Sequence, residues 1–131
     1  MNRHQARRAT FTLIYQHSYG VHGSYSDLYT HMCVEEEIET NEYIAAMVTA
    51  MDKNLGEIDT RISTHAKGWD IGRISRVTLS ILRLSLCEMA YCDVPREVSI
   101  NEAVELAKEF DTDEAPPFIN GVLDKATENE E

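Results

Sequence analysis

The chain has 131 residues, enough for one domain with a buried core, and 43% of them are hydrophobic while 27% are charged. This balance is too apolar for wholesale disorder, and no apolar run is long and uninterrupted enough for a membrane span. The formal net charge of −11 by itself opposes binding to nucleic acid. We expect a single domain over residues 1–131 with a frayed acidic tail from about residue 128.

Cysteine and histidine usage indicates a reducing compartment and no metal site. The first eight residues include three arginines, but no uninterrupted apolar segment follows them, so a secretory signal peptide is not expected. The three cysteines, Cys33, Cys87 and Cys92, are odd in number and lack CxxC spacing, and the five histidines are scattered. We therefore expect a cytoplasmic protein that binds no metal and no other cofactor.

The charge is distributed unevenly along the chain. Residues 1–26 contain Arg3, Arg7 and Arg8 and no acidic residue, whereas residues 27–131 hold nine basic and 23 acidic residues, a net of −14. Arg3 and Arg7 are four residues apart and share one face of a predicted helix. The first helix is thus electrostatically distinct from the rest of the chain. Its arginines either bind an anionic partner or are merely solvated.

Helical spacing of apolar residues runs through nearly the whole chain, and period-2 alternation is absent, so the predicted fold is all-α. Gly20 follows the first helix, Ser99 and Glu102 have the form of a capping box, and Pro116 fits the first turn of the last helix. Trp69 is expected to fill the seam at a turn between two helices. We predict about seven helices, near residues 4–19, 24–32, 41–53, 55–65, 73–91, 99–110 and from 116 onward. Their shared core is predicted to contain Ile81, Leu84, Leu106, Ala107, Val122 and Leu123.

The helix over 73–91 is apolar on most of its circumference and carries one acidic residue on an apolar face. At about 100° per residue, Glu88 lies within roughly 40° of Val77, Ile81 and Leu84. A carboxylate in such surroundings needs a partner. The partner is either an arginine of the same chain or a residue of another protein.

The most specific pattern lies in the C-terminal third. The run VPREVSINEAVELAKEF at 94–110, followed by FINGVLDK at 118–125, closely resembles the signature of the NusB transcription-antitermination family. Further likeness lies in ARRA at 6–9, LIYQ at 13–16 and ILRL at 81–84. The resemblance covers nearly the whole chain and is weak only over about 21–54.

This resemblance implies a fold of two small helical bundles packed together. It implies an RNA-binding antitermination factor that pairs with NusE, a small-subunit ribosomal protein. The pair would bind the single-stranded boxA element of nascent RNA, notably ribosomal RNA, within the RNA polymerase antitermination complex. The alternative is a protein-only adaptor that has the fold but has lost RNA binding, in keeping with the net charge.

The resemblance also implies where the two partners bind. The arginine-bearing start of the first helix, with Arg3, Arg7 and Arg8, is expected to contact RNA, and Tyr15 or Phe118 to stack on an unpaired base. NusE is expected on the central helix, around Glu88, Val77, Ile81 and Leu84. We further expect Glu88 to be partly exposed and to pair with a basic side chain of NusE.

Enzymatic activity is not expected. The sequence contains no phosphate-binding GxxxxGK[ST] loop, no GxSxG nucleophile motif and no HExxH metal motif. A short helical domain also leaves little room for a substrate-binding region. We expect neither a small-molecule substrate nor a membrane association.

Overall fold

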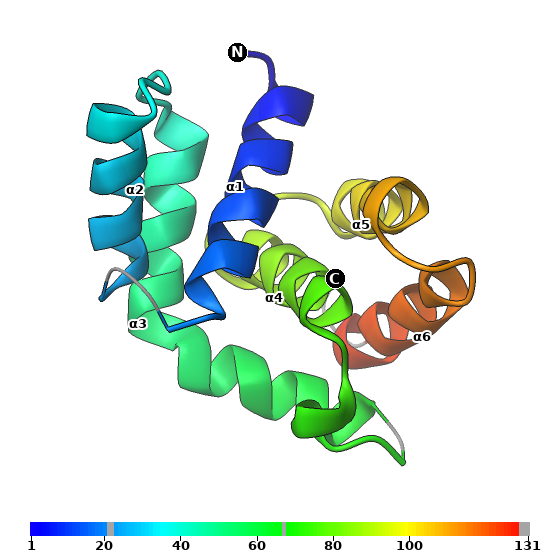
Figure 1. The fold of residues 1–131 in the computed structure, drawn as a ribbon. Helices are drawn as coiled ribbons and strands as arrows, with labels where there is room; N and C mark the ends of the chain where they lie inside the picture. The colour runs from blue at the N-terminus through cyan, green and yellow to red at the C-terminus, as the bar shows by residue number, and fades with distance from the viewer. Residues whose placement is uncertain (21–22, 67, 129–131) are drawn as a thin grey trace.

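The computed structural model describes residues 1–20, 23–66 and 68–128, and every regular element in that part of the chain is helical (Figure 1). The all-α prediction is therefore confirmed. The α-helices are α1 (Arg3–His17), α2 (Tyr25–Glu35), α3 (Glu42–His65), α4 (Arg76–Tyr91), α5 (Arg96–Phe110) and α6 (Ala115–Thr127), and a 3-10 turn, η1 (Ile71–Arg73), precedes α4.

The described residues form six α-helices rather than about seven, because two predicted helices are one. The segments 41–53 and 55–65 are continuous as α3. No proline separates them, and Nδ2 of Asn54 donates to the carbonyl of Ala50 without breaking the helix. Figure 1 shows α3 changing direction in its middle, so that its first part lies beside α2 and its last part reaches α6.

The helix starts follow local hydrogen bonding, and one predicted start is wrong. Asn2 and Gln5 form a capping box that opens α1. The pair Ser99 and Glu102 was predicted to open a helix in the same way, but α5 begins three residues earlier, after Pro95. Ser99 is instead buried inside the first turns of α5, where its hydroxyl binds another side chain.

The six helices form two groups of three that share one hydrophobic core. The helices α1, α2 and α3 contact one another, as do α4, α5 and α6, and α4 also lies against α1 and α3 (Figure 1). The predicted core is confirmed, since all its members are buried in the same cluster: Ile81, Leu84, Leu106, Ala107, Val122 and Leu123.

The remaining features of the fold are the lengths of its helices and the end of the chain. None of the helices in residues 1–20, 23–66 and 68–128 is long and apolar enough to cross a membrane. Of the tail expected to fray from about residue 128, only Glu128 belongs to the described part of the chain, and residues 129–131 lie outside it.

The continuity of α3 predicts that Gly56→Ala stabilises the protein. Gly56 is exposed inside the helix, and an added Cβ would meet no heavy atom within 4 Å. Alanine should raise the free energy of unfolding by about 0.5–1 kcal/mol, measured by urea denaturation. As the control, Gly68→Ala should be destabilising, because Gly68 has a φ of 78°. Destabilisation by Gly56→Ala would contradict the placement of Gly56 at an exposed position in the interior of α3.

Candidate functional site

A buried ion pair connects the start of the chain to the central helix. Nε of Arg7, on α1, donates to Oε2 of Glu88, on α4, over 2.7 Å. Arg7 is 3% exposed and Glu88 is fully buried. A second bond runs from Nη1 of Arg7 to Oε1 of Glu102, on α5, over 3.2 Å. The guanidinium of Arg7 is thus held by carboxylates from two other helices.

The remaining acceptor sites of Glu88 are occupied by hydroxyl groups. The Tyr43 hydroxyl, on α3, donates to Oε2 over 2.5 Å, and the Ser99 hydroxyl donates to Oε1 over 2.7 Å. Ser85 lies 2.8 Å from the Ser99 oxygen and can donate to it. Burial, followed by the Glu88 carboxylate, raises the pKa of Tyr43 far above its usual value. Tyr43 is therefore a neutral hydrogen-bond donor.

The electrostatics of Arg7 follow from the same contacts. Burial alone lowers the pKa of Arg7, but the Glu88 charge and hydrogen bond raise it, and the net change is upward. Arg7 is therefore positively charged, and its guanidinium is bound by carboxylates of its own chain. Breaking such a pair leaves an uncompensated buried charge, which is the costly outcome for stability.

The predicted partner surface requires correction. Glu88, Ile81 and Leu84 are all fully buried, and Glu88 pairs with an arginine of its own chain, so the expectation that Glu88 is partly exposed is wrong. Val77 alone of the four is half-buried and still reaches the surface. The helical wheel placed Glu88 correctly on an apolar face, but it contains no information on a partner 81 residues away.

Arg3 and Arg8 remain as surface cations of α1, whereas Arg7 offers RNA almost no accessible surface. The guanidinium carbon of Arg3 lies 4.8 Å from the ring centroid of Tyr43. Arg8 lies 5.4 Å from the centroid of Phe110 and forms an ion pair with Glu109 over 2.9 Å. Both cations thus rest on aromatic rings, with their guanidinium groups at the surface.

A row of aromatic rings continues from Arg8 along α1. Phe110 stacks on Phe11 at 5.0 Å between centroids, and Phe11 stacks on Tyr15 at 6.3 Å. Tyr15 then meets Tyr19 edge-on at 5.4 Å, and their hydroxyl oxygens are 2.8 Å apart. Tyr15 is half-buried and Phe110 is 39% exposed. We call Phe110, Phe11, Tyr15 and Tyr19 the aromatic row.

Most of the aromatic row was not among the predicted site residues, although a signal for it existed. Positions 11, 15 and 19 are spaced four apart, which places them on one face of the first helix. Arg76, at the start of α4, lies over the ring of Tyr19 at 4.3 Å and donates to the carbonyl of Ser18. The contribution of Phe110 from α5 has no local signal, because it depends on how α5 packs against α1.

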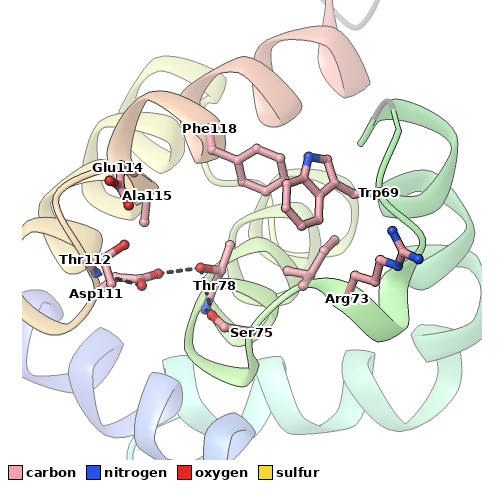
Figure 2. A pocket seen from close by; sticks show the side chains of 10 residues that line it. Trp69, Arg73, Ser75, Thr78, Asp111, Thr112, Glu114, Ala115 and Phe118 are labelled. Atoms are coloured by element: carbon pink, nitrogen blue, oxygen red, sulfur yellow. Dashed lines mark hydrogen bonds between the residues drawn. The ribbon is translucent and has the colours of Figure 1, made fainter.

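An open pocket of about 430 Å³ lies between the segment that leads into α4 and the start of α6 (Figure 2). Its aromatic wall is made by Phe118 and Trp69, whose ring centroids are 6.3 Å apart in an edge-on arrangement. On the other side, the Thr78 hydroxyl donates to Asp111 over 2.5 Å, and Figure 2 shows this contact across the pocket. Asp111, which lines the pocket, directly follows Phe110 in the chain.

The pocket also corrects the expectation for Trp69. The indole is 50% exposed and lies at the edge of the pocket, so it does not fill a seam between helices. Phe118 is half-buried on the pocket wall. Two accessible aromatic side chains in one pocket are suited to stacking on unpaired bases of a single-stranded nucleic acid.

The comparison with known families agrees with this geometry. A protein-family model described as the NusB family matches residues 4–128. The chain belongs to the NusB family. The match includes the segment 21–54, in which the sequence resemblance alone was weak. The match therefore runs from His4, the second residue of α1, through α6, and Arg3 lies just outside it.

Individual members of the NusB family show the same relationship in sequence and structure. The transcription antitermination protein NusB of Natranaerobius thermophilus is 39% identical over 95% of this chain and 94% of its own length. The structure of T. maritima NusB superposes with a TM-score of 0.87 at 28% identity, over 98% of this chain and 92% of that one. A chain of the crystal structure of the antitermination factors NusB and NusE with dsRNA gives a TM-score of 0.81 at 25% identity, over 98% of both chains.

The buried ion pair predicts a large stability loss for Glu88→Gln. The substitution removes the negative charge that faces the buried guanidinium of Arg7, so the free energy of unfolding should fall by about 3–5 kcal/mol in thermal or urea denaturation. The matched control is Glu109→Gln, which disrupts the exposed pair with Arg8 and should change the stability by at most about 1 kcal/mol. Equal effects of the two substitutions would contradict the assignment of Glu88 as an internal structural residue.

Proposed function

We propose that this protein is a transcription antitermination factor that binds single-stranded RNA of the boxA type together with NusE. In this role it acts in the cytoplasm as part of an RNA polymerase antitermination complex on nascent transcripts, notably those of ribosomal RNA. It performs no catalysis. Membership in the NusB family supports the role, and a structurally similar chain has been crystallised with NusE and dsRNA.

One observation supports RNA binding most directly: each of the two exposed arginines of α1 lies over an aromatic ring, Arg3 over Tyr43 and Arg8 over the exposed Phe110. A separate pocket offers the aromatic side chains of Trp69 and Phe118. The cations contact phosphates, and the rings stack on bases that are not paired. Tyr15, which is half-buried inside the aromatic row, contributes mainly by supporting Phe11.

The burial of Arg7 limits the affinity of the protein for RNA in the absence of a partner. Only Arg3 and Arg8 of the three predicted contacts remain available for phosphates. At about 0.7 per phosphate on a single strand, two contacts give a slope of about −1.4 for log K against log salt concentration. Such a weak electrostatic contribution requires a partner that supplies further contacts, which is the role proposed for NusE.

The partner surface is proposed at the end of the aromatic row, where α1 meets the start of α4. Tyr19 is 55% exposed there, Arg76 covers its ring, and the half-buried Val77 is next to Arg76 in the chain. Exposed aromatic and arginine side chains are enriched at protein interfaces. This location keeps the partner beside the RNA surface without covering Phe110.

Arg8→Ala tests the cationic part of the RNA surface. In fluorescence anisotropy with a labelled boxA RNA and NusE present, the substitution should weaken RNA binding by about 1 kcal/mol, roughly fivefold. The salt slope should become shallower by about 0.7, while the melting temperature stays nearly unchanged. Lys53→Ala is the control, because Lys53 is an exposed cation of α3 outside this surface. Unaltered affinity for Arg8→Ala would mean that Arg8 is only solvated.

Phe110→Leu tests the aromatic part. Leucine retains an apolar side chain against Phe11 but removes the stacking face, so RNA affinity should fall by about 1–3 kcal/mol. NusE binding by the same variant, measured by calorimetry, should not change. If the wild-type protein binds NusE but no RNA with or without it, the protein is the protein-only adaptor instead.

A further inference from the structure

Tyr43 lies between the two arginines that share one face of α1. Its ring centroid is 4.8 Å from the guanidinium carbon of Arg3 and 5.6 Å from that of Arg7. The ring is 8% exposed, so packing fixes its place at the start of α3. Its hydroxyl donates to Glu88, the same carboxylate that pairs with Arg7. One buried carboxylate therefore fixes both the helix that carries Arg3 and the ring on which Arg3 rests.

Arg3 differs from the other basic residues of α1 in the kind of contact that its side chain makes. Among the described residues, the side-chain ion pairs of α1 start from His4, Arg7 and Arg8. Arg3 is exposed, and its guanidinium lies over the ring of Tyr43 in a cation–π contact. A long exposed side chain loses conformational entropy when it is held at a phosphate, so a surface that orients it beforehand favours binding.

The contact with the ring leaves the guanidinium able to bind. A cation–π contact is an attraction between the charge of the guanidinium and the face of the ring, and it does not require the N–H groups as hydrogen-bond donors. These donors form the fork that matches two phosphate oxygens. The contact with Tyr43 thus restricts the orientation of Arg3 without using any of its hydrogen-bond donors.

We propose that Tyr43 is a positioning residue for RNA binding, whose ring holds the Arg3 guanidinium in the orientation that contacts a phosphate. The proposal rests on the RNA-binding function proposed above. Tyr43 itself does not touch the RNA in this arrangement. It acts through Arg3; packing at the start of α3 fixes the place of its ring, and its hydroxyl bond to Glu88 contributes to stability.

A double-mutant cycle of Arg3→Ala and Tyr43→Leu tests the proposal. RNA binding is measured by anisotropy with a labelled boxA RNA, in the complex with NusE and well below the melting temperature of every variant. With Arg3 present, Tyr43→Leu should lower the affinity roughly two- to fivefold, the range for a cation–π contact. In the Arg3→Ala background the same substitution should change the affinity less than about 1.5-fold.

Two further variants separate positioning from folding. Tyr43→Phe keeps the ring and loses the bond to Glu88, so it should lower the melting temperature while the RNA affinity stays near that of the wild type. Arg3→Lys changes only an exposed side chain and therefore leaves the fold intact. It keeps the charge and the salt slope but loses the planar stacking group, and it should lower the affinity by the same two- to fivefold.

The outcomes distinguish this proposal from the proposed function. Equal losses from Tyr43→Leu in both backgrounds would show a purely structural role and overturn the proposal, as would wild-type affinity for Arg3→Lys. In both cases RNA binding itself, and its dependence on Arg8, would be retained. Failure of the wild-type complex to bind the RNA would overturn the proposed function and this inference together.

Discussion

The Arg7 guanidinium and the Glu88 carboxylate meet 2.7 Å apart where the carboxylate is fully buried and the arginine almost so. Two buried charges are tolerated only if their remaining hydrogen-bonding groups also find partners. The need for these partners draws Tyr43 from α3 and Ser99 and Glu102 from α5 to the same point. The pair is therefore the constraint that relates α1 to the other helices, and an alternative packing would leave a charge unpaired.

The three arginines at the start of the chain therefore have two different roles. The buried arginine fixes the orientation of α1, and the flanking Arg3 and Arg8 then project from the helix at defined places. Each of the two flanking guanidinium groups lies on an aromatic ring from another helix, Tyr43 of α3 or Phe110 of α5. A surface built in this way is rigid, because its cations are supported by side chains from the core or its edge. Preorganisation of this kind reduces the entropy lost on binding.

Much of the fold followed from local pattern, because apolar periodicity reports burial and Gly, Pro and capping residues report helix ends. The core positions from Ile81 to Leu123 were correct for this reason. The continuity of α3 was missed because the prediction ended one helix before Asn54, although the Asn54 side chain bonds the carbonyl of Ala50 without breaking the helix. The partner of Glu88 was missed because pairing across 81 residues depends on tertiary packing. Phe110 was overlooked in the same way, since its stacking on Phe11 exists only after α5 has packed.

The acid-free first helix influences the direction from which an RNA approaches the protein. Residues 1–26 carry a local positive charge, while the rest of the chain has a net charge of −14. The molecule is therefore an electric dipole, and a polyanion is turned toward α1 before any contact forms. The approach of an RNA is thus steered toward the face that carries Arg3 and Arg8, and added salt slows this approach.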